Sequence, residues 1–146
     1  APVSSDEEVM WTVDLNSLGG IHGQGGGGAH ITSQGIVFAS PVSVLSPRHA
    51  PCRSQLSREE LQKIAKAVSS AKPSAWKSSY VPRGDDGCCD RFHWTLLLYQ
   101  HAPDGAGHTY GTDWYDGNEK RLPDDLASLR TTILSIKNTV LKACEQ

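Results

Sequence analysis

Four cysteines are the residues with the clearest chemistry in this chain: Cys52, Cys88, Cys89 and Cys144. An even number of cysteines in a chain of 146 residues is typical of disulfide-bonded proteins from oxidising compartments. Cys88 and Cys89 are adjacent, and neighbouring residues of an extended chain point to opposite faces, so these thiols do not simply share one partner. The sequence therefore predicts a protein whose cysteines are oxidised.

Six histidines raise the question of a metal site. His22 and His30 flank a glycine-rich run, and His101 and His108 flank a predicted turn. Neither pair has the helical i, i+4 spacing of a zinc protease, and the chain has no C-x-x-C motif. Isolated surface histidines explain these pairs better, but His22 and His30 leave open a metal- or small-ligand-binding enzyme.

Known catalytic signatures are absent from the sequence. It contains no G-x-S-x-G and no H-E-x-x-H motif, and no Gly-Lys-Ser/Thr follows the glycine-rich run. Most aspartates fall in predicted turns or at a helix start, where they have local structural roles. We therefore expect a non-catalytic protein without a cofactor.

The glycine-rich run covers residues 19–28, of which seven are glycine. Glycine loses much backbone freedom on ordering, so the run predicts a flexible hairpin connection. Mobile loops on rigid sheets often carry recognition. Gly20, His22 and Gln24 are therefore candidate partner-binding residues, and a loose loop without a function is the alternative of equal weight.

Two aromatic residues at the end of a predicted strand, Trp114 and Tyr115, are further candidates for partner binding. Aromatic side chains at strand ends can anchor a protein partner. Filling of the hydrophobic core is the alternative explanation for both.

Hydrophobic periodicity predicts four strands and two helices. The strands are expected at residues 9–15, 29–38, 90–100 and 109–115, and the helices at 57–71 and 123–144. Their order, β-β-α-β-β-α, predicts an α+β fold in which an antiparallel four-stranded sheet carries both helices on one face. Residues 1–8 are expected to form a flexible tail, and residues 9–146 a single domain.

The boundaries of these elements have local signals. Ser57 and Glu60 form a capping box at the start of the first helix, and Pro73 stops that helix. Gly35 predicts a turn or bulge within the strand at 29–38. Residues 39–55 are rich in proline and serine and are expected to form a loop.

The direction of travel of these elements helps to choose the cysteine pairing. The third strand and the second helix both span roughly 33 Å, so Cys144 is expected near the finishing end of that strand, far from Cys88 and Cys89. Cys52 begins at the same end. The preferred pairing is therefore Cys52 with Cys144, which leaves a vicinal Cys88–Cys89 disulfide. A crossed pattern, with one adjacent cysteine bonded to Cys52 and the other to Cys144, stays open because vicinal rings are rare.

Composition and charge narrow the class of protein. The formal net charge is −2 and the basic residues are scattered, so nothing points to nucleic acid or an anionic membrane as a partner. No apolar run approaches the roughly 20 residues of a membrane span. The small first residue and polar tail are typical of signal-peptidase cleavage, which predicts a secreted or periplasmic protein. A chain trimmed for expression would begin in the same way.

From Ser57 onward the chain resembles the emfourin-like proteins, small inhibitors of thermolysin-like metalloproteases. The shared features are the capped helix from Leu56, a strand with Asp90, Phe92, Leu96 and Leu98, and a closing helix that begins Pro-x-x-Leu. The early Gly19–Gly20 pair also matches, and the likeness covers about Leu56 to Ile136. The resemblance implies a protein partner, a secreted metalloprotease, but no inhibitory residue is carried over from it. The same layout is similar to several secreted bacterial domains.

The sequence thus predicts a secreted, non-catalytic protein-binding domain, with protease inhibition as its most specific form. Two other classes stay open. One is a metal- or small-ligand-binding enzyme that uses His22 and His30. The other is a subunit of an extracellular assembly in which the glycine-rich segment orders against a neighbour.

Overall fold

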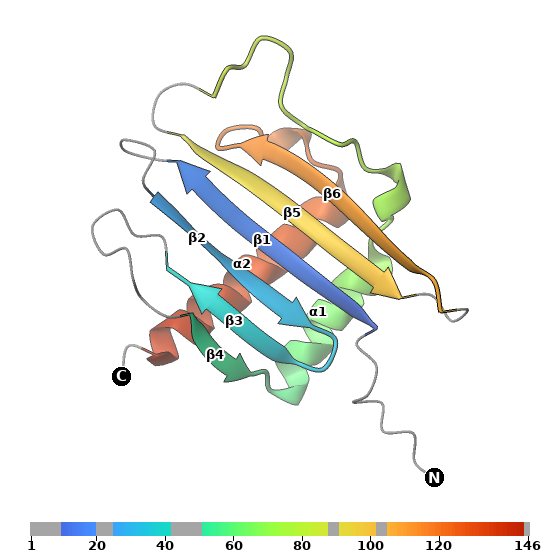
Figure 1. The fold of residues 1–146 in the computed structure, drawn as a ribbon, viewed down its shortest axis with the longest axis vertical. Helices are drawn as coiled ribbons and strands as arrows, with labels where there is room; N and C mark the ends of the chain where they lie inside the picture. The colour runs from blue at the N-terminus through green and yellow to red at the C-terminus, as the bar shows by residue number, and fades with distance from the viewer. Residues whose placement is uncertain (1–9, 20–24, 42–50, 88–90, 102–104, 145–146) are drawn as a thin grey trace.

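The computed structural model describes residues 10–19, 25–41, 51–87, 91–101 and 105–144. They form one six-stranded antiparallel sheet in the strand order β4-β3-β2-β1-β5-β6, with two long helices beside it (Figure 1). In chain order the elements are β1 (Trp11–Gly19), β2 (Gly25–Thr32), β3 (Ile36–Ser40), β4 (Cys52–Gln55), α1 (Arg58–Ser70), η3 (Pro73–Ala75), β5 (Phe92–His101), β6 (Gly107–Tyr115), η4 (Glu119–Arg121) and α2 (Asp124–Cys144).

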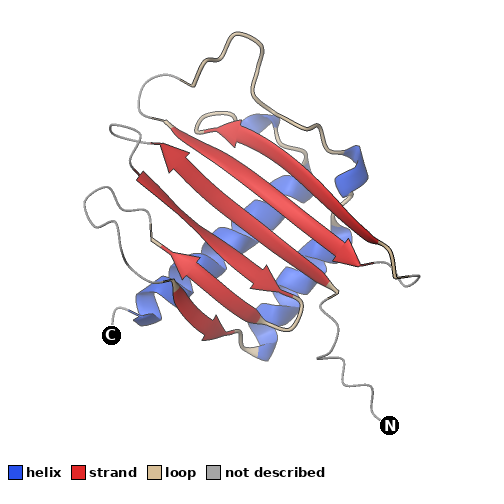
Figure 2. Cartoon of the chain, in the orientation of Figure 1, coloured by secondary structure: helices blue, strands red, loops and turns tan. Residues whose placement is uncertain are grey.

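Both helices lie on the same side of the sheet, behind it in Figure 2, and no helix among the described residues covers the other side. The core fills the space between the two layers, with Leu15, Leu96 and Ile133 among its fully buried side chains. Strand residues alternate between the two faces of the sheet. Val13 and Leu15 of β1 are therefore buried, whereas Asp14 and Asn16 point away from the helices. No helix within the described ranges combines the length and apolar character needed to cross a membrane.

The predicted four-stranded sheet is wrong, because the sheet has six strands, and the order of strands and long helices is β-β-β-β-α-β-β-α instead of β-β-α-β-β-α. The strand expected at 29–38 is two strands, β2 and β3, joined by a tight turn at Gly35, whose φ of 88° suits glycine. The loop expected at 39–55 contains β4, which pairs with β3 at the edge of the sheet. Its four residues, Cys-Arg-Ser-Gln, lack the apolar alternation that predicts a strand.

The glycine-rich run is also partly strand. Residues 25–28 belong to β2, which pairs with β1 on one side and, from Gly28, with β3 on the other. A Cβ at Gly28 would lie 2.6 Å from the Leu15 carbonyl oxygen, and one at Gly27 would lie 2.8 Å from the Pro41 backbone. These glycines therefore allow a close backbone approach, a use that glycine content alone does not separate from a flexible loop. Residues 20–24 lie outside the described residues.

The helix boundaries follow local chemistry. The capping box predicted for α1 is confirmed: Glu60 N donates to Ser57 Oγ at 3.1 Å, and Ser57 N donates to Glu60 Oε1 at 3.3 Å. The helix ends at Ser70, before Pro73. α2 begins directly after Pro123 with two acidic residues in its first turn, where carboxylates interact well with the helix dipole.

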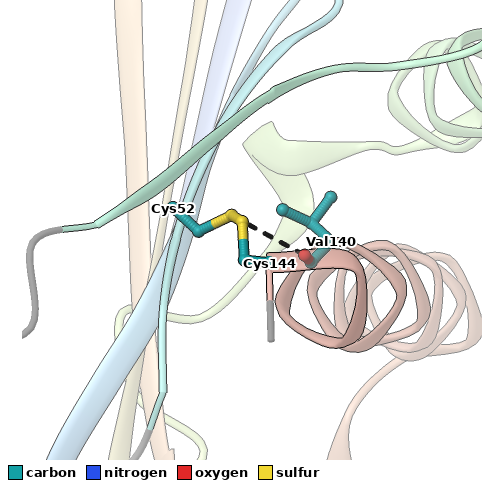
Figure 3. The surroundings of a disulfide bond; sticks show 3 residues. All are labelled: Cys52, Val140 and Cys144. Carbon is teal, nitrogen blue, oxygen red and sulfur yellow. Dashed lines mark hydrogen bonds between the residues drawn. A yellow bond between two sulfur atoms is a disulfide. The ribbon is translucent and has the colours of Figure 1, made fainter. Parts of the chain in front are cut away.

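A disulfide joins Cys52 of β4 to Cys144 in the last turn of α2, which confirms the preferred pairing for these two residues (Figure 3). The two Cα atoms are 6.4 Å apart, and Cys52 Sγ lies 3.6 Å from the Val140 carbonyl oxygen. A disulfide sulfur has no proton to donate, so this last contact is one of packing. The bond ties the shortest strand, at one edge of the sheet, to the helical layer. Cys88 and Cys89 lie outside the described residues.

Replacing both Cys52 and Cys144 by alanine is expected to lower the free energy of unfolding by about 4 kcal/mol. The bond closes a loop with a sequence separation of 92 residues, so its loss returns much conformational entropy to the unfolded chain. Urea denaturation of the variant and the wild type measures the difference. A loss below about 1 kcal/mol would show that the edge strand is held without the disulfide.

Gly28→Ala is expected to destabilise the protein by about 2 kcal/mol, because the new Cβ meets backbone that has no room to move. The matched control is Gly111→Ala, another strand glycine, at which a Cβ meets the end of the Leu97 side chain at 2.9 Å and no backbone atom nearer than 3.9 Å. The control separates the effect of replacing a strand glycine from the close backbone approach at Gly28. Unchanged thermal stability of Gly28→Ala would mean that residues 25–28 are a loose connection rather than packed strand.

Candidate partner-binding face

The sheet face turned away from the helices, called the open face here, is built from rows of cross-strand partners. Directly paired residues of neighbouring antiparallel strands project to the same side. The rows that the pairing places across the open face include Gly111, Leu97, Asp14, His30, Phe38 and Arg53; then Asp113, Thr95, Asn16, Gly28 and Ser40; then Tyr115, His93, Leu18 and Gly26.

Large apolar side chains are exposed on this face. Leu18 is 66% exposed, Leu97 41% and Phe38 38%. Met10, the fourth exposed large hydrophobic residue in the described part of the chain, stands at the start of β1. Three of the four thus lie on the surface that no helix covers, whereas the inward-facing apolar residues of the same strands are buried.

The first polar cluster on the open face is a stack of four residues from four strands. His30 Nδ1 donates to Asp14 Oδ1 at 2.6 Å, which orients the ring and leaves the second ring nitrogen out of this bond. The ring of Phe38 lies 6.3 Å from that of His30, and the Arg53 guanidinium lies 6.0 Å from the Phe38 ring centroid.

The second cluster repeats this arrangement near the β5–β6 end of the sheet. His93 Nε2 donates to Asp113 Oδ2 at 2.6 Å, and the His93 ring packs on Tyr115 with centroids 4.8 Å apart. The Arg91 guanidinium lies 5.2 Å from the Tyr115 centroid. Both clusters thus combine an aspartate, a histidine, an aromatic ring and an arginine, and of these the aromatic residues and arginine are enriched in protein interfaces.

The spacing of the two clusters decides what size of ligand can contact both. His30 and His93 are two strand intervals apart across the sheet, about 10 Å, and their rows are four residues apart along β1, about 13 Å. The two histidines therefore do not meet on one small molecule. A surface of protein size can contact both.

Asp85 holds the guanidinium of Arg91 in place. The carboxylate accepts from both terminal guanidinium nitrogens of Arg91, and also from Gly87 N at 3.0 Å and Asn118 Nδ2 at 3.3 Å. These hydrogen bonds, led by that of Arg91, lower the pKa of Asp85, and the bond to Asp85 raises the pKa of Arg91. The turn before β5 is thereby fixed to the second cluster.

Glycines opposite large side chains flatten the part of the open face over β5 and β6, whereas a hollow of about 320 Å³ lies over β1, β2 and β3. A Cβ at Gly107 would lie 2.6 Å from the Tyr99 hydroxyl, and one at Gly111 would lie 2.9 Å from Leu97 Cδ2. The side chains of Tyr99 and Leu97 therefore lie across the glycines of the neighbouring strand instead of standing away from the sheet. A flat region of this kind suits contact with another broad surface.

The predicted partner-binding residues have different places in the structure. Tyr115 lies on the open face in the second cluster, whereas Trp114 points into the core and is fully buried. Its position in the core accounts for Trp114 without a partner. Gly20, His22 and Gln24 lie outside the described residues.

Most of the residues that make up the open face were not predicted as functional. The available signal was the alternation itself: Asp14 and Leu18 of β1 and Leu97 of β5 fall in the phase opposite to the buried positions. An apolar residue in the outward phase of a strand marks an exposed contact site. The pairing of His93 with Asp113 carries no such signal, because it depends on strand register.

The structure offers no metal centre within its described ranges. No three histidine, cysteine, aspartate or glutamate side chains come together there in a way that could hold a metal ion. His30, one of the two histidines considered for a metal site, is bonded to Asp14, and its proposed companion His22 lies outside the described residues.

Comparison with known proteins adds no family assignment: no protein-family model matches the chain, and no curated protein matches it.

Replacing Asp85 by asparagine is expected to make stability less sensitive to acid. The pKa of Asp85 is lowered in the folded protein, so its ionised form stabilises the fold above the ordinary aspartate pKa of about 3.9, and that contribution is lost as the pH falls through the folded value. The variant should therefore melt below the wild type at pH 7, with the gap narrowing below about pH 4. Thermal unfolding from pH 7 to 3 measures this.

The control for this prediction is Glu59→Gln, which removes an exposed carboxylate on α1 that pairs only with Lys63 at 3.8 Å. It should melt only slightly below the wild type, since an exposed pair and an exposed first-turn carboxylate each contribute little. A gap between Asp85→Asn and wild type that stays constant from pH 7 to 3 would contradict the role given to the Arg91–Asp85 pair.

Proposed function

We propose that this chain is a secreted or periplasmic, non-catalytic protein-binding domain, and that it binds its partner on the open face. The observation that carries the proposal is the exposure of Leu18, Phe38 and Leu97 on the one sheet face without a helical cover. Exposed apolar residues gathered on one surface mark interaction sites in soluble proteins.

The polar groups of the open face suit a protein partner better than a small ligand. Each of the two clusters presents an aromatic ring, an arginine and a hydrogen-bonded histidine, and the clusters are too far apart for one small molecule. A six-stranded face about 24 Å wide and 30 Å long has roughly 700 Å², close to the 800 Å² that each partner buries in a typical interface.

The specific form of the proposal is inhibition of a thermolysin-like metalloprotease, the partner that the emfourin-like resemblance implies. Binding across the open face would block a protease without any chemistry on the inhibitor. The Cys52–Cys144 disulfide supports the extracellular or periplasmic setting that such a partner requires, because disulfides persist in oxidising compartments.

The test compares the wild type with a Leu18→Glu, Leu97→Glu double variant. Two buried carboxylates at the centre of an interface should weaken binding about 100-fold or more. The matched control is Thr131→Glu with Asn138→Glu, which adds the same charge at two exposed positions of α2. Thermolysin inhibition and calorimetric titration are the readouts, after circular dichroism has shown that both variants are folded.

Wild type and control are expected to inhibit thermolysin, whereas the double variant should not. Absence of inhibition by the wild type would rule out the thermolysin-like form. The broader proposal is then tested by affinity capture from the secreted proteins of the source organism. A partner retained equally by all three proteins would show that the open face is not the binding surface, and self-association lost only in the double variant would identify the partner as a second copy.

A further inference from the structure

A second surface with recognisable chemistry lies away from the open face, beside strand β6. Between Glu60 and Asp85 the sequence contains no acidic residue. The same stretch contains five basic residues, Lys63, Lys66, Lys72, Lys77 and Arg83. The chain as a whole has a net charge of −2, so this stretch is a local concentration of positive charge. Counting basic residues over the whole chain does not reveal it.

Two of these cations converge with Arg121 of η4 on one hollow of about 460 Å³. Lys77 and Arg83 come from the loop after η3, and Ser79 and Tyr80 of that loop also line the hollow. Its volume falls in the range of about 300–1,000 Å³ that small-molecule sites occupy.

The loop that carries the cations is fixed at its start and at its centre. Asp125 of α2 accepts from Lys72 N at 2.8 Å and from Trp76 Nε1 at 2.9 Å. Tyr80 is almost fully buried, and its backbone N–H donates to the Asp113 carbonyl oxygen of β6 at 2.8 Å. The loop is therefore already ordered in the folded protein. A ligand that binds there does not have to offset the entropy lost when the loop becomes ordered.

Three nearby carboxylates are bonded to other groups. Asp85 is bonded to Arg91, Glu119 lies 3.9 Å from Arg130, and Asp125 holds the loop start. Among the described residues, no carboxylate lies within salt-bridge distance of Lys77, Arg83 or Arg121. Three positive charges thus line one hollow, and no carboxylate of the described ranges forms an ion pair with them.

Two hydroxyl groups complete the set of donors. Tyr80 Oη accepts from Lys77 N at 3.0 Å, and Ser79 Oγ accepts from Val81 N at 3.2 Å. Each oxygen accepts one backbone hydrogen bond, and each hydroxyl carries a proton that it can donate to a ligand. The hollow therefore presents cationic and hydroxyl donors and, among its charged side chains, no anion.

We propose that this hollow binds a tetrahedral oxyanion, a phosphate or sulfate group. Arginine forks and a lysine ammonium bind such groups by charge-assisted hydrogen bonds, and several donors from different directions suit a dianion with four oxygens better than a planar carboxylate. The hollow is larger than a lone anion requires. The bound oxyanion is therefore either the free ion or a group carried by a small molecule.

The experiment titrates the isotope-labelled protein with sodium phosphate at constant ionic strength and follows backbone amide shifts. Saturable shifts are expected for residues 77–83 and Arg121, and Arg83→Gln and Arg121→Gln should each weaken binding about tenfold. The matched control is Lys66→Gln, which removes an exposed cation of α1 from the same basic stretch but outside the hollow. It should bind phosphate like the wild type.

Parallel titrations with glucose 6-phosphate and glucose separate the two sources. Tighter binding of the sugar phosphate than of phosphate, with no response to glucose, assigns the site to an esterified group. Equal affinity of the two phosphates assigns it to the free ion. Shifts that do not saturate, or an equal loss of affinity in Lys66→Gln and Arg83→Gln, would overturn the proposal. None of these outcomes depends on the open face.

Discussion

The fold depends on one constraint, that two helices cover only one side of a six-stranded sheet. An antiparallel sheet can remain stable with one solvated face, provided that each strand keeps its apolar residues in a single phase. β1 and β5 meet this condition through Leu15, Leu96 and Leu98, which are buried against the helical layer. The same register that buries these residues necessarily places Asp14, Leu18 and their row partners on the open face.

The capping box at Ser57 was predicted correctly from a local cause, because its two residues are three apart. The pairing of Cys52 with Cys144 was also predicted correctly, although Cys52 lies level with Leu96 in the middle of β5 and not with the end of that strand, as the prediction had assumed. The features that were missed depend on contacts between distant segments. Gly28 is strand because it pairs with Asn16 of β1 and Ser40 of β3, and β4 is strand because it pairs with β3. Neither contact leaves a periodic trace in the sequence.

The candidate site shows the same division. An outward apolar phase is visible along β1 and β5, so the sequence could have indicated that the second face would be exposed. The residues that form each cluster could not be predicted from this alternation. The contacts of His93 with Asp113 and of Arg53 with Phe38 depend on the register of neighbouring strands. In the same way, Arg121 joins Lys77 and Arg83 only because η4 packs beside their loop.

The most direct test of the central claim, that the open face is the binding surface, is side-chain footprinting by photochemical carbene labelling with and without the partner. If the open face is the binding surface, the partner should protect Leu18, Phe38 and Leu97, while labelling of Asn138 on α2 and Lys66 on α1 stays the same. Protection of the helical layer with unchanged labelling of the three open-face residues would contradict that claim.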